Sequence, residues 1–214
     1  MTERDCVLIL AGPSGAGKTT VMNEITRCCA GFELVRSMTT RKRRNDGNDG
    51  EYIYTAKEEF LELLSREEML EFTEYAGNYY GTPYSEIKRI FASGKTPLLI
   101  LDMNGVHALK KRKLDFGVYS VYIYSSPEEL SERLGARYFS EGERGIELYA
   151  ERMRANARDF KNMRLYEGIF DSAVMNTEIS SAVSEVVSAY EEKRRDFSAE
   201  IFLEMAKSRV FLLE

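Results

Sequence analysis

A glycine-rich segment near the start of the chain has the composition of a phosphate-binding loop. Its residues satisfy the pattern G-x-x-x-x-G-K-S/T and run Gly12-Pro13-Ser14-Gly15-Ala16-Gly17-Lys18-Thr19-Thr20. Glycine lets the backbone turn several N–H groups toward one phosphate, and a helix that begins at Lys18 adds the positive end of its dipole. We expect Lys18 to contact the β- and γ-phosphates, and the Thr19 hydroxyl to bind Mg²⁺. The segment therefore predicts the donor half of a phosphoryl-transfer site that uses ATP.

The flanking residues support this interpretation over a glycine turn that binds nothing. An apolar run at 6–11 predicts a buried strand before the loop, and residues 18–29 show helical periodicity after it. A second apolar run, 97–101, ends at Asp102, where an acid could support a metal ion beside the loop. The alternative for Asp102 is an ordinary N-cap of the next helix.

A basic segment could bind a second phosphate. Arg41 and Arg44 lie three residues apart, and Tyr52 and Tyr80 supply phenol groups further along the chain. Guanidinium groups suit phosphate because they donate two parallel hydrogen bonds. A solvated basic loop is the alternative, and in isolation the more common one.

These residues must be positioned by an α/β fold. Buried strands are predicted at 6–11, 97–101, 118–124 and 172–175, and a short strand within 32–40. They alternate with helices at 18–29, 85–93, 130–164 and 179–195, the third of them interrupted near 140–145, which predicts a three-layer αβα core with a central parallel sheet. We expect the core to comprise 1–33 and 85–195, with a helical lid at about 135–155, a small β-containing insert at 34–84 and a helical tail at 196–214. The apolar tail could pack on the core, which we favour, or on a partner.

Composition excludes several classes of protein. The net charge of −5 over 214 residues disfavours binding to nucleic acid, and the one histidine disfavours a histidine-based triad or metal site. Three cysteines without a C-x-x-C pair favour a reducing compartment. We find no targeting segment and no apolar run long enough to span a membrane, so we expect a cytoplasmic protein, either monomer or homodimer.

Taken together, the motifs resemble those of guanylate kinases, a family of phosphate-loop nucleoside monophosphate kinases. Four segments carry the resemblance: the glycine-rich loop, Ser37-Met38-Thr39-Thr40-Arg41 with Arg44, Glu71 followed by Gly77-Asn78-Tyr79-Tyr80-Gly81-Thr82, and Asp102-Met103-Asn104-Gly105. Their order and spacing agree with the family over residues 5–135, and more weakly to about residue 195. The combination of G-N-Y-Y-G with S-x-T-T-R is far more specific than the loop alone.

The resemblance implies a role for each matching residue. The GMP-binding residues would be Ser37, Arg41, Arg44, Tyr52, Glu71, Tyr80, Thr82 and Asp102. Glu71 would accept hydrogen bonds from guanine N1–H and the 2-amino group, which adenine lacks. Asp102 would lie between GMP and the magnesium ion, which Thr19 would also bind. Lys18, Arg41, Arg137 and Arg152 would be catalytic, with Arg144 and Arg154 as competitors for the role of Arg152.

Two departures from the family pattern bear on these roles. Ile100 stands where the family usually has an acid, two residues before Asp102, so the magnesium site would rely on Asp102. The stretch 138–149 is longer than the usual lid. Two rival functions remain open: phosphorylation of a related acceptor such as a ribose phosphate, and a guanylate-kinase-like module that only binds partners.

Overall fold

The core of the protein is a parallel sheet. A computed structural model describes residues 5–43, 52–75 and 77–211. The core strands are β1 (Cys6–Ala11), β2 (Phe32–Leu34), β7 (Thr96–Ile100), β8 (Gly117–Tyr124) and β9 (Ser172–Met175). They lie in the order β2-β7-β1-β8-β9, and every neighbouring pair is parallel. This confirms the predicted α/β class and the central parallel sheet.

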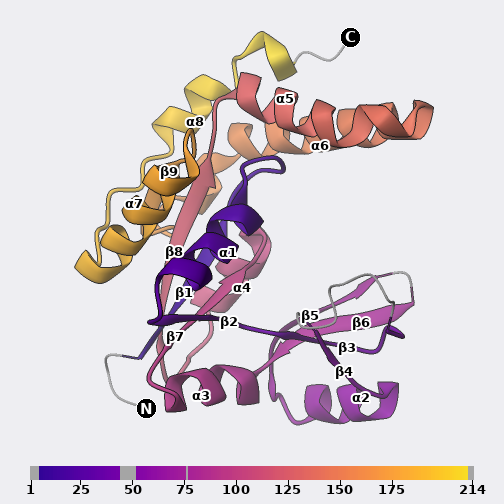
Figure 1. The fold of residues 1–214 in the computed structure, drawn as a ribbon, viewed down its shortest axis with the longest axis vertical. Helices are drawn as coiled ribbons and strands as arrows, with labels where there is room; N and C mark the ends of the chain where they lie inside the picture. Colours follow the sequence, from indigo (N-terminus) through magenta and orange to yellow (C-terminus); the bar gives the residue numbers. More distant parts are fainter. Residues whose placement is uncertain (1–4, 44–51, 76, 212–214) are drawn as a thin grey trace.

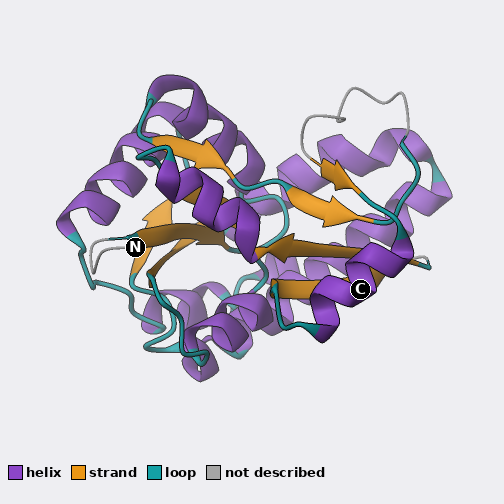
Figure 2. Cartoon of the chain, turned by 90° about the horizontal axis from the view of Figure 1, so that it is seen from below, coloured by secondary structure: helices purple, strands orange, loops and turns teal. Residues whose placement is uncertain are grey.

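Helices lie on both sides of the core strands (Figure 2). They are α1 (Lys18–Cys28), α3 (Tyr84–Ala92), α4 (Met103–Lys110), α5 (Pro127–Tyr138), α6 (Glu143–Lys161), α7 (Ile179–Glu192) and α8 (Glu200–Met205). β1 occupies the middle of the sheet because its residues 7–11 are apolar and fully buried. α1 follows β1 directly and buries Val21, Met22 and Ile25, so the loop between them is held at both ends by the core.

A second, smaller sheet lies beside the core, at the lower right of Figure 1. Its strands are β3 (Ser37–Thr39), β4 (Tyr52–Tyr54), β5 (Met69–Tyr75) and β6 (Asn78–Pro83), in the order β4-β3-β6-β5, and α2 (Lys57–Ser65) packs with it. Met38, Phe60 and Met69 form its separate apolar core. The short strand expected within 32–40 is present as two strands, β2 and β3, which belong to different sheets because the chain leaves the core at Val35 and Arg36.

Two long helices, α5 and α6, extend from the opposite end of the core (Figure 1). α5 begins at a capping box in which Ser126 and Glu129 satisfy each other's backbone N–H groups. The break that separates the two helices includes Gly142, which has a φ of 68°. The predicted interruption near 140–145 is thus present.

The C-terminal segment packs on the core, which is the alternative we favoured. Phe202 in α8 is fully buried, and Phe211 is 8% exposed. The Phe202 ring contacts Tyr122 of β8 at a centroid distance of 4.8 Å and Phe160 of α6 at 5.8 Å. Such edge and tilted ring pairs add stability beyond the buried area itself. Among the described residues, no helix has the length and apolarity needed to cross a membrane.

Candidate active site

The glycine-rich loop joins β1 to α1 and depends on glycine at both ends. Gly12 has a φ of 144° and Gly17 a φ of 80°, values that residues with a side chain rarely adopt. A Cβ atom on Gly12 would overlap the carbonyl oxygen of Ile123, and one on Gly17 would overlap the side-chain amide of Asn176. The tight packing of β8 and β9 against the loop therefore imposes the two glycines of the motif.

Lys18 folds back over the loop that precedes it. Its ammonium group donates hydrogen bonds to the carbonyl oxygens of Gly12 at 2.9 Å and Pro13 at 2.8 Å. Burial lowers the pKa of Lys18 to about 8, the charge of Asp159 opposes that shift, and the charge of Arg152 adds to it. The lysine is thus a partly desolvated cation beside the loop, which strengthens its attraction for a phosphate.

Two buried asparagines, one on α6 and one just after β9, form hydrogen bonds with the loop. Asn156 of α6 accepts a hydrogen bond from the Ser14 N–H at 2.8 Å and donates one to the Ser14 carbonyl oxygen at 2.9 Å. Asn176, just after β9, donates to the Ala16 carbonyl oxygen at 2.8 Å. Both asparagines are 1% exposed. Asn156 could not be identified from the sequence, because one asparagine within a charged helix gives no periodic signal.

A cavity of about 410 Å³ opens beside the loop. It is lined by Ser14, Gly15, Gly17, Lys18, Thr19, Thr20, Arg133, Leu134, Arg137, Tyr138 and Arg152. The remaining loop residues, Gly12, Pro13 and Ala16, carry the carbonyl groups that Lys18 and Asn176 contact. This donor cavity thus combines most of the predicted loop residues with both predicted lid arginines.

The arginines of the donor cavity differ in how firmly they are held. Arg133 donates to the Ser125 hydroxyl at 2.9 Å and to the Asn176 carbonyl oxygen at 2.9 Å. The Arg137 guanidinium lies 5.4 Å from the Tyr138 ring centroid. Within the part of the chain that the structure describes, neither Arg144 nor Arg154 lines this cavity, which favours Arg152 in the role that the three could share.

A second cavity, of about 690 Å³, lies between the small sheet and α4. Its lining includes five predicted acceptor residues, namely Ser37, Tyr52, Glu71, Tyr80 and Asp102. A third cavity of about 230 Å³ shares Ser37, Tyr52 and Glu71 with it and adds Thr82 and Thr19. Because Thr19 also lines the donor cavity, the acceptor side and the donor loop meet at this threonine.

Glu71 and Thr82 face each other across the antiparallel pair β5–β6. The Thr82 hydroxyl donates a hydrogen bond to Glu71 Oε1 at 2.7 Å. Burial raises the pKa of Glu71, the Thr82 hydrogen bond opposes that shift, and the charge of Asp102 adds to it. None of the groups that shift the pKa of Glu71 is a cation. The Glu71 carboxylate can therefore accept hydrogen bonds from donors that enter the cavity.

The basic and aromatic residues of the acceptor side are grouped together where the structure describes them. Arg41 donates to the Tyr54 hydroxyl at 3.3 Å, and its guanidinium lies 5.5 Å from the Tyr52 ring centroid. The Tyr52 and Tyr80 ring centroids are 6.3 Å apart. Arg44, the other predicted phosphate ligand, lies outside the described residues.

Asp102 is the N-cap of α4, one of the two alternatives that the sequence left open. Its Oδ1 accepts a hydrogen bond from the Gly105 N–H at 2.6 Å and so caps α4, while the residue also lines the acceptor cavity. Ile100, at the end of β7, lines the second and third cavities. An aliphatic side chain thus stands where we noted the missing acid.

Comparisons with known proteins agree with this arrangement. The sequence model of the family described as guanylate kinase matches residues 4–193. The guanylate kinase of Enterococcus faecalis is 36% identical over 188 residues, which cover 87% of this chain and 88% of that protein. That of Lactobacillus johnsonii is 34% identical over 193 residues, 89% of this chain and 90% of that protein.

A solved structure supports the fold. The crystal structure of guanylate kinase from Anaplasma phagocytophilum covers 100% of this chain and 99% of its own, with a TM-score of 0.59 at 22% identity. At that identity the likeness concerns the fold, whereas the family model and the sequence relatives extend over most of the chain. The resemblance noted in the motifs is thereby confirmed, and this chain belongs to the guanylate kinase family.

Proposed function

We propose that this protein transfers the γ-phosphoryl group of ATP to GMP, and to dGMP, giving ADP and GDP. The observation that carries the proposal is the Glu71–Thr82 hydrogen bond inside a cavity that reaches Thr19 of the phosphate loop. A half-buried carboxylate there would accept from guanine N1–H and the 2-amino group. Adenine lacks that pair of donors and would leave the carboxylate unpaired, which costs binding energy.

Phosphoryl transfer at this site would depend on position and charge. Lys18, Arg137 and Arg152 surround the donor cavity, and Arg41 lies beside the acceptor tyrosines. Their charges would hold the two substrates in line and stabilise the negative charge of the transferring group. The GMP phosphate is itself an anionic nucleophile, so the reaction requires no general base. Ser37, Arg44, Tyr52 and Tyr80 would complete the GMP site.

Thr19 of the donor loop and Asp102 at the start of α4 have side chains of the kind that binds a magnesium ion together with ATP. Thr19 offers a hydroxyl and Asp102 a carboxylate, the hard oxygen donors that Mg²⁺ prefers, and Mg²⁺ commonly keeps several waters and substrate phosphate oxygens as its other ligands. When bound, the ion would neutralise charge on the β- and γ-phosphates. Ile100 contributes no ligand, so Asp102 would be the carboxylate that supports the ion.

The test is a coupled ADP-release assay with GMP, dGMP, AMP and ribose 5-phosphate as acceptors. We expect turnover with GMP and dGMP, little with AMP and none with the sugar phosphate. Turnover with ribose 5-phosphate and not with GMP would favour the rival function, phosphorylation of a ribose phosphate. Binding of GMP without turnover would favour the non-catalytic module.

Lys18→Ala provides the second arm of the test. This variant should lose phosphoryl transfer and keep GMP binding, because Lys18 lies in the donor cavity, whereas Glu71 and Thr82 lie on the small sheet. Unchanged turnover would refute the role of the loop. Three expectations from the sequence stay predictions: the domain limits, the oligomeric state (monomer or homodimer) and the cytoplasmic location. Gel filtration of the purified protein would decide the oligomeric state.

A further inference from the structure

The chain enters and leaves the small sheet through two short connections that lie close to one ion-pair network. It enters between Leu34 of β2 and Ser37 of β3, and it leaves where Pro83 of β6 is followed directly by Tyr84 of α3. Connections this short give the small sheet little slack relative to the core. A contact that joins the two connections can therefore set how the sheets sit relative to each other.

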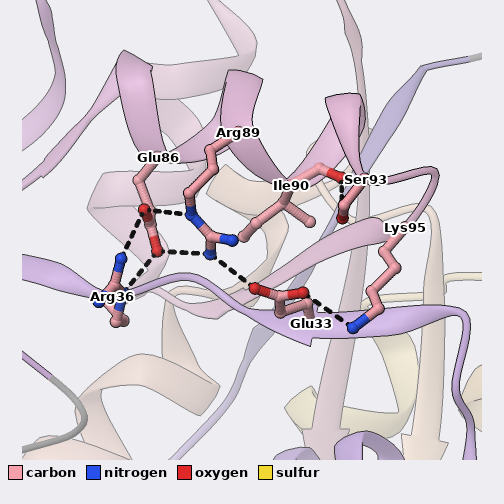
Figure 3. A network of polar contacts seen from close by, with 7 residues as sticks. All are labelled: Glu33, Arg36, Glu86, Arg89, Ile90, Ser93 and Lys95. Carbon is pink, nitrogen blue, oxygen red and sulfur yellow. Dashed lines mark hydrogen bonds and ion pairs between the residues drawn. The ribbon is translucent and has the colours of Figure 1, made fainter.

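Glu86 supplies such a contact from the first turn of α3. It is 3% exposed, and its carboxylate accepts two hydrogen bonds from each of two arginines (Figure 3). Arg36 donates from Nε at 2.8 Å and from Nη2 at 3.2 Å, while Arg89 donates from Nε at 2.8 Å and from Nη2 at 2.9 Å. Paired bonds of this kind fix the geometry of a guanidinium and a carboxylate.

The two arginines have different places in the fold. Arg89 belongs to α3, as Glu86 does, and its Nη2 also donates to Glu33 of β2 at 2.6 Å. Arg36 instead lies on the entering connection, directly before Ser37. Arg89 leaves Glu86 with one paired cation when Arg36 is replaced, whereas only the Arg36–Glu86 pair links the entering connection to the leaving one.

We infer that the Arg36–Glu86 pair is a positioning contact that fixes the spacing of the two connections and so places the acceptor-binding residues of the small sheet against the donor loop. The inference rests on the proposed function. Ser37, Tyr52, Glu71 and Thr82 all belong to strands of the small sheet, whereas the loop and the lid arginines belong to the core. Release of the pair should therefore weaken GMP binding and leave ATP binding nearly unchanged.

The test compares Arg36→Gln with Lys95→Gln. Lys95 belongs to the same network, where it donates to Glu33 at 2.9 Å, and its side chain is 41% exposed against 42% for Arg36. Each variant removes one cation of similar exposure, but the Lys95 contact lies wholly within the core. We expect Arg36→Gln to raise the KM for GMP about tenfold, which corresponds to about 1.4 kcal/mol, and to change the KM for ATP less than about twofold. Arg36→Lys, which keeps the charge but not the paired geometry, should give an intermediate value.

Hydrogen exchange supplies a readout that does not depend on turnover. The Val35 N–H is bonded to the Leu98 carbonyl oxygen at 2.9 Å, and the Tyr84 N–H to that of Glu68 at 3.0 Å, so both amides report on the connections. Exchange at these amides should accelerate in Arg36→Gln and not in Lys95→Gln.

The results of these experiments distinguish failure of the positioning role of the Arg36–Glu86 pair from failure of the proposed function. An unchanged KM for GMP in an active Arg36→Gln protein, an equal rise in Lys95→Gln, or unchanged exchange at Val35 and Tyr84 would overturn the positioning role. If the wild-type protein does not phosphorylate GMP while exchange at the two amides accelerates in Arg36→Gln alone, the proposed function fails and the contact between the connections stands.

Discussion

Asn156 of helix α6 pairs with both main-chain groups of Ser14 in the phosphate loop, at 2.8 Å and 2.9 Å. The contact spans 142 residues of sequence, and its Asn156 side chain is buried. It ties α6, which carries Arg152, to the loop that precedes Lys18. Since Arg152 and Asn156 are one helical turn apart, they can face the loop together.

Asn156→Ala should therefore loosen the phosphate loop. Loss of two hydrogen bonds, with polar groups of Ser14 left unpaired, should lower the free energy of unfolding by about 1–3 kcal/mol. It should also raise the KM for ATP more than the KM for GMP. Denaturant unfolding and steady-state kinetics measure both effects. Asn162→Ala, an exposed position at the end of the same helix, is the control, and an equal loss there would contradict the role of Asn156.

Glu71→Gln should impair the use of guanine far more than that of adenine. The amide keeps one oxygen for the Thr82 hydroxyl but presents N–H donors to guanine N1–H and its 2-amino group. We expect kcat/KM for GMP to fall by about two orders of magnitude or more, with no comparable fall for AMP. Glu74→Gln, at an exposed position on the same strand, is the matched control. A similar fall for both nucleotides would indicate a general defect and argue against base recognition.

Arg152→Ala should lower kcat, whereas Arg154→Ala should not. Both side chains are exposed on α6, but Arg152 lines the donor cavity. Removal of one cation that stabilises the transferring group should cost about a hundredfold or more in kcat, with a smaller effect on the KM for GMP. Single-turnover measurements at saturating substrate isolate the chemical step. Equal kcat values for the two variants would remove Arg152 from the proposed mechanism.

Glu86 should give the protein an acid-sensitive component of stability. Burial by itself raises the pKa of Glu86, but the hydrogen bonds and charges of Arg89 and Arg36 outweigh burial and hold the pKa at about 2, against 4.5 for an ordinary glutamate. A lowered folded-state pKa means that the stabilisation is complete above about pH 4.5 and is lost as the pH falls toward 2. Glu33 and Lys95 complete the charges of this network.

The difference in unfolding free energy between the wild-type protein and Glu86→Gln measures this component, since other acids titrate in both proteins. The difference should shrink as the pH falls from about 4.5 to about 2. Glu62→Gln, which removes an ion pair with Arg66 that is exposed on α2, should show no such trend. A constant difference across this range would show that the contribution of Glu86 to the free energy of unfolding does not depend on its charge.

The donor loop was predictable because its determinants are contiguous. Gly12, Gly17 and Lys18 encode the backbone turn, the helix start and the phosphate contact within a few residues, and the apolar run before them encodes the strand. Glu71 and Thr82 are further apart, and only the spacing of the family motifs assigned them a common role.

The supporting contacts could not be predicted because they are tertiary. Asn176 lies 160 residues from the Ala16 carbonyl group to which it donates, and Arg36 lies 50 residues from Glu86. In sequence, Arg36 and Glu86 look like solvated charges, and only the fold shows that the buried Glu86 carboxylate is paired with arginines. The division of residues 32–40 between two sheets has the same origin, since short strands take their partners from the packing of the whole chain.

The aromatic tail has a consequence for how the chain acquires its structure during synthesis. Tyr122 of β8 and Phe160 of α6 pack against Phe202, and Phe160 also contacts the Phe211 ring at a centroid distance of 5.6 Å. Until residue 211 has been synthesised, the apolar surface around Tyr122 and Phe160 would lack the aromatic rings that cover it, although the phosphate loop is synthesised much earlier. A growing chain would therefore remain open to aggregation and chaperone capture until nearly all of the sequence shown here has emerged.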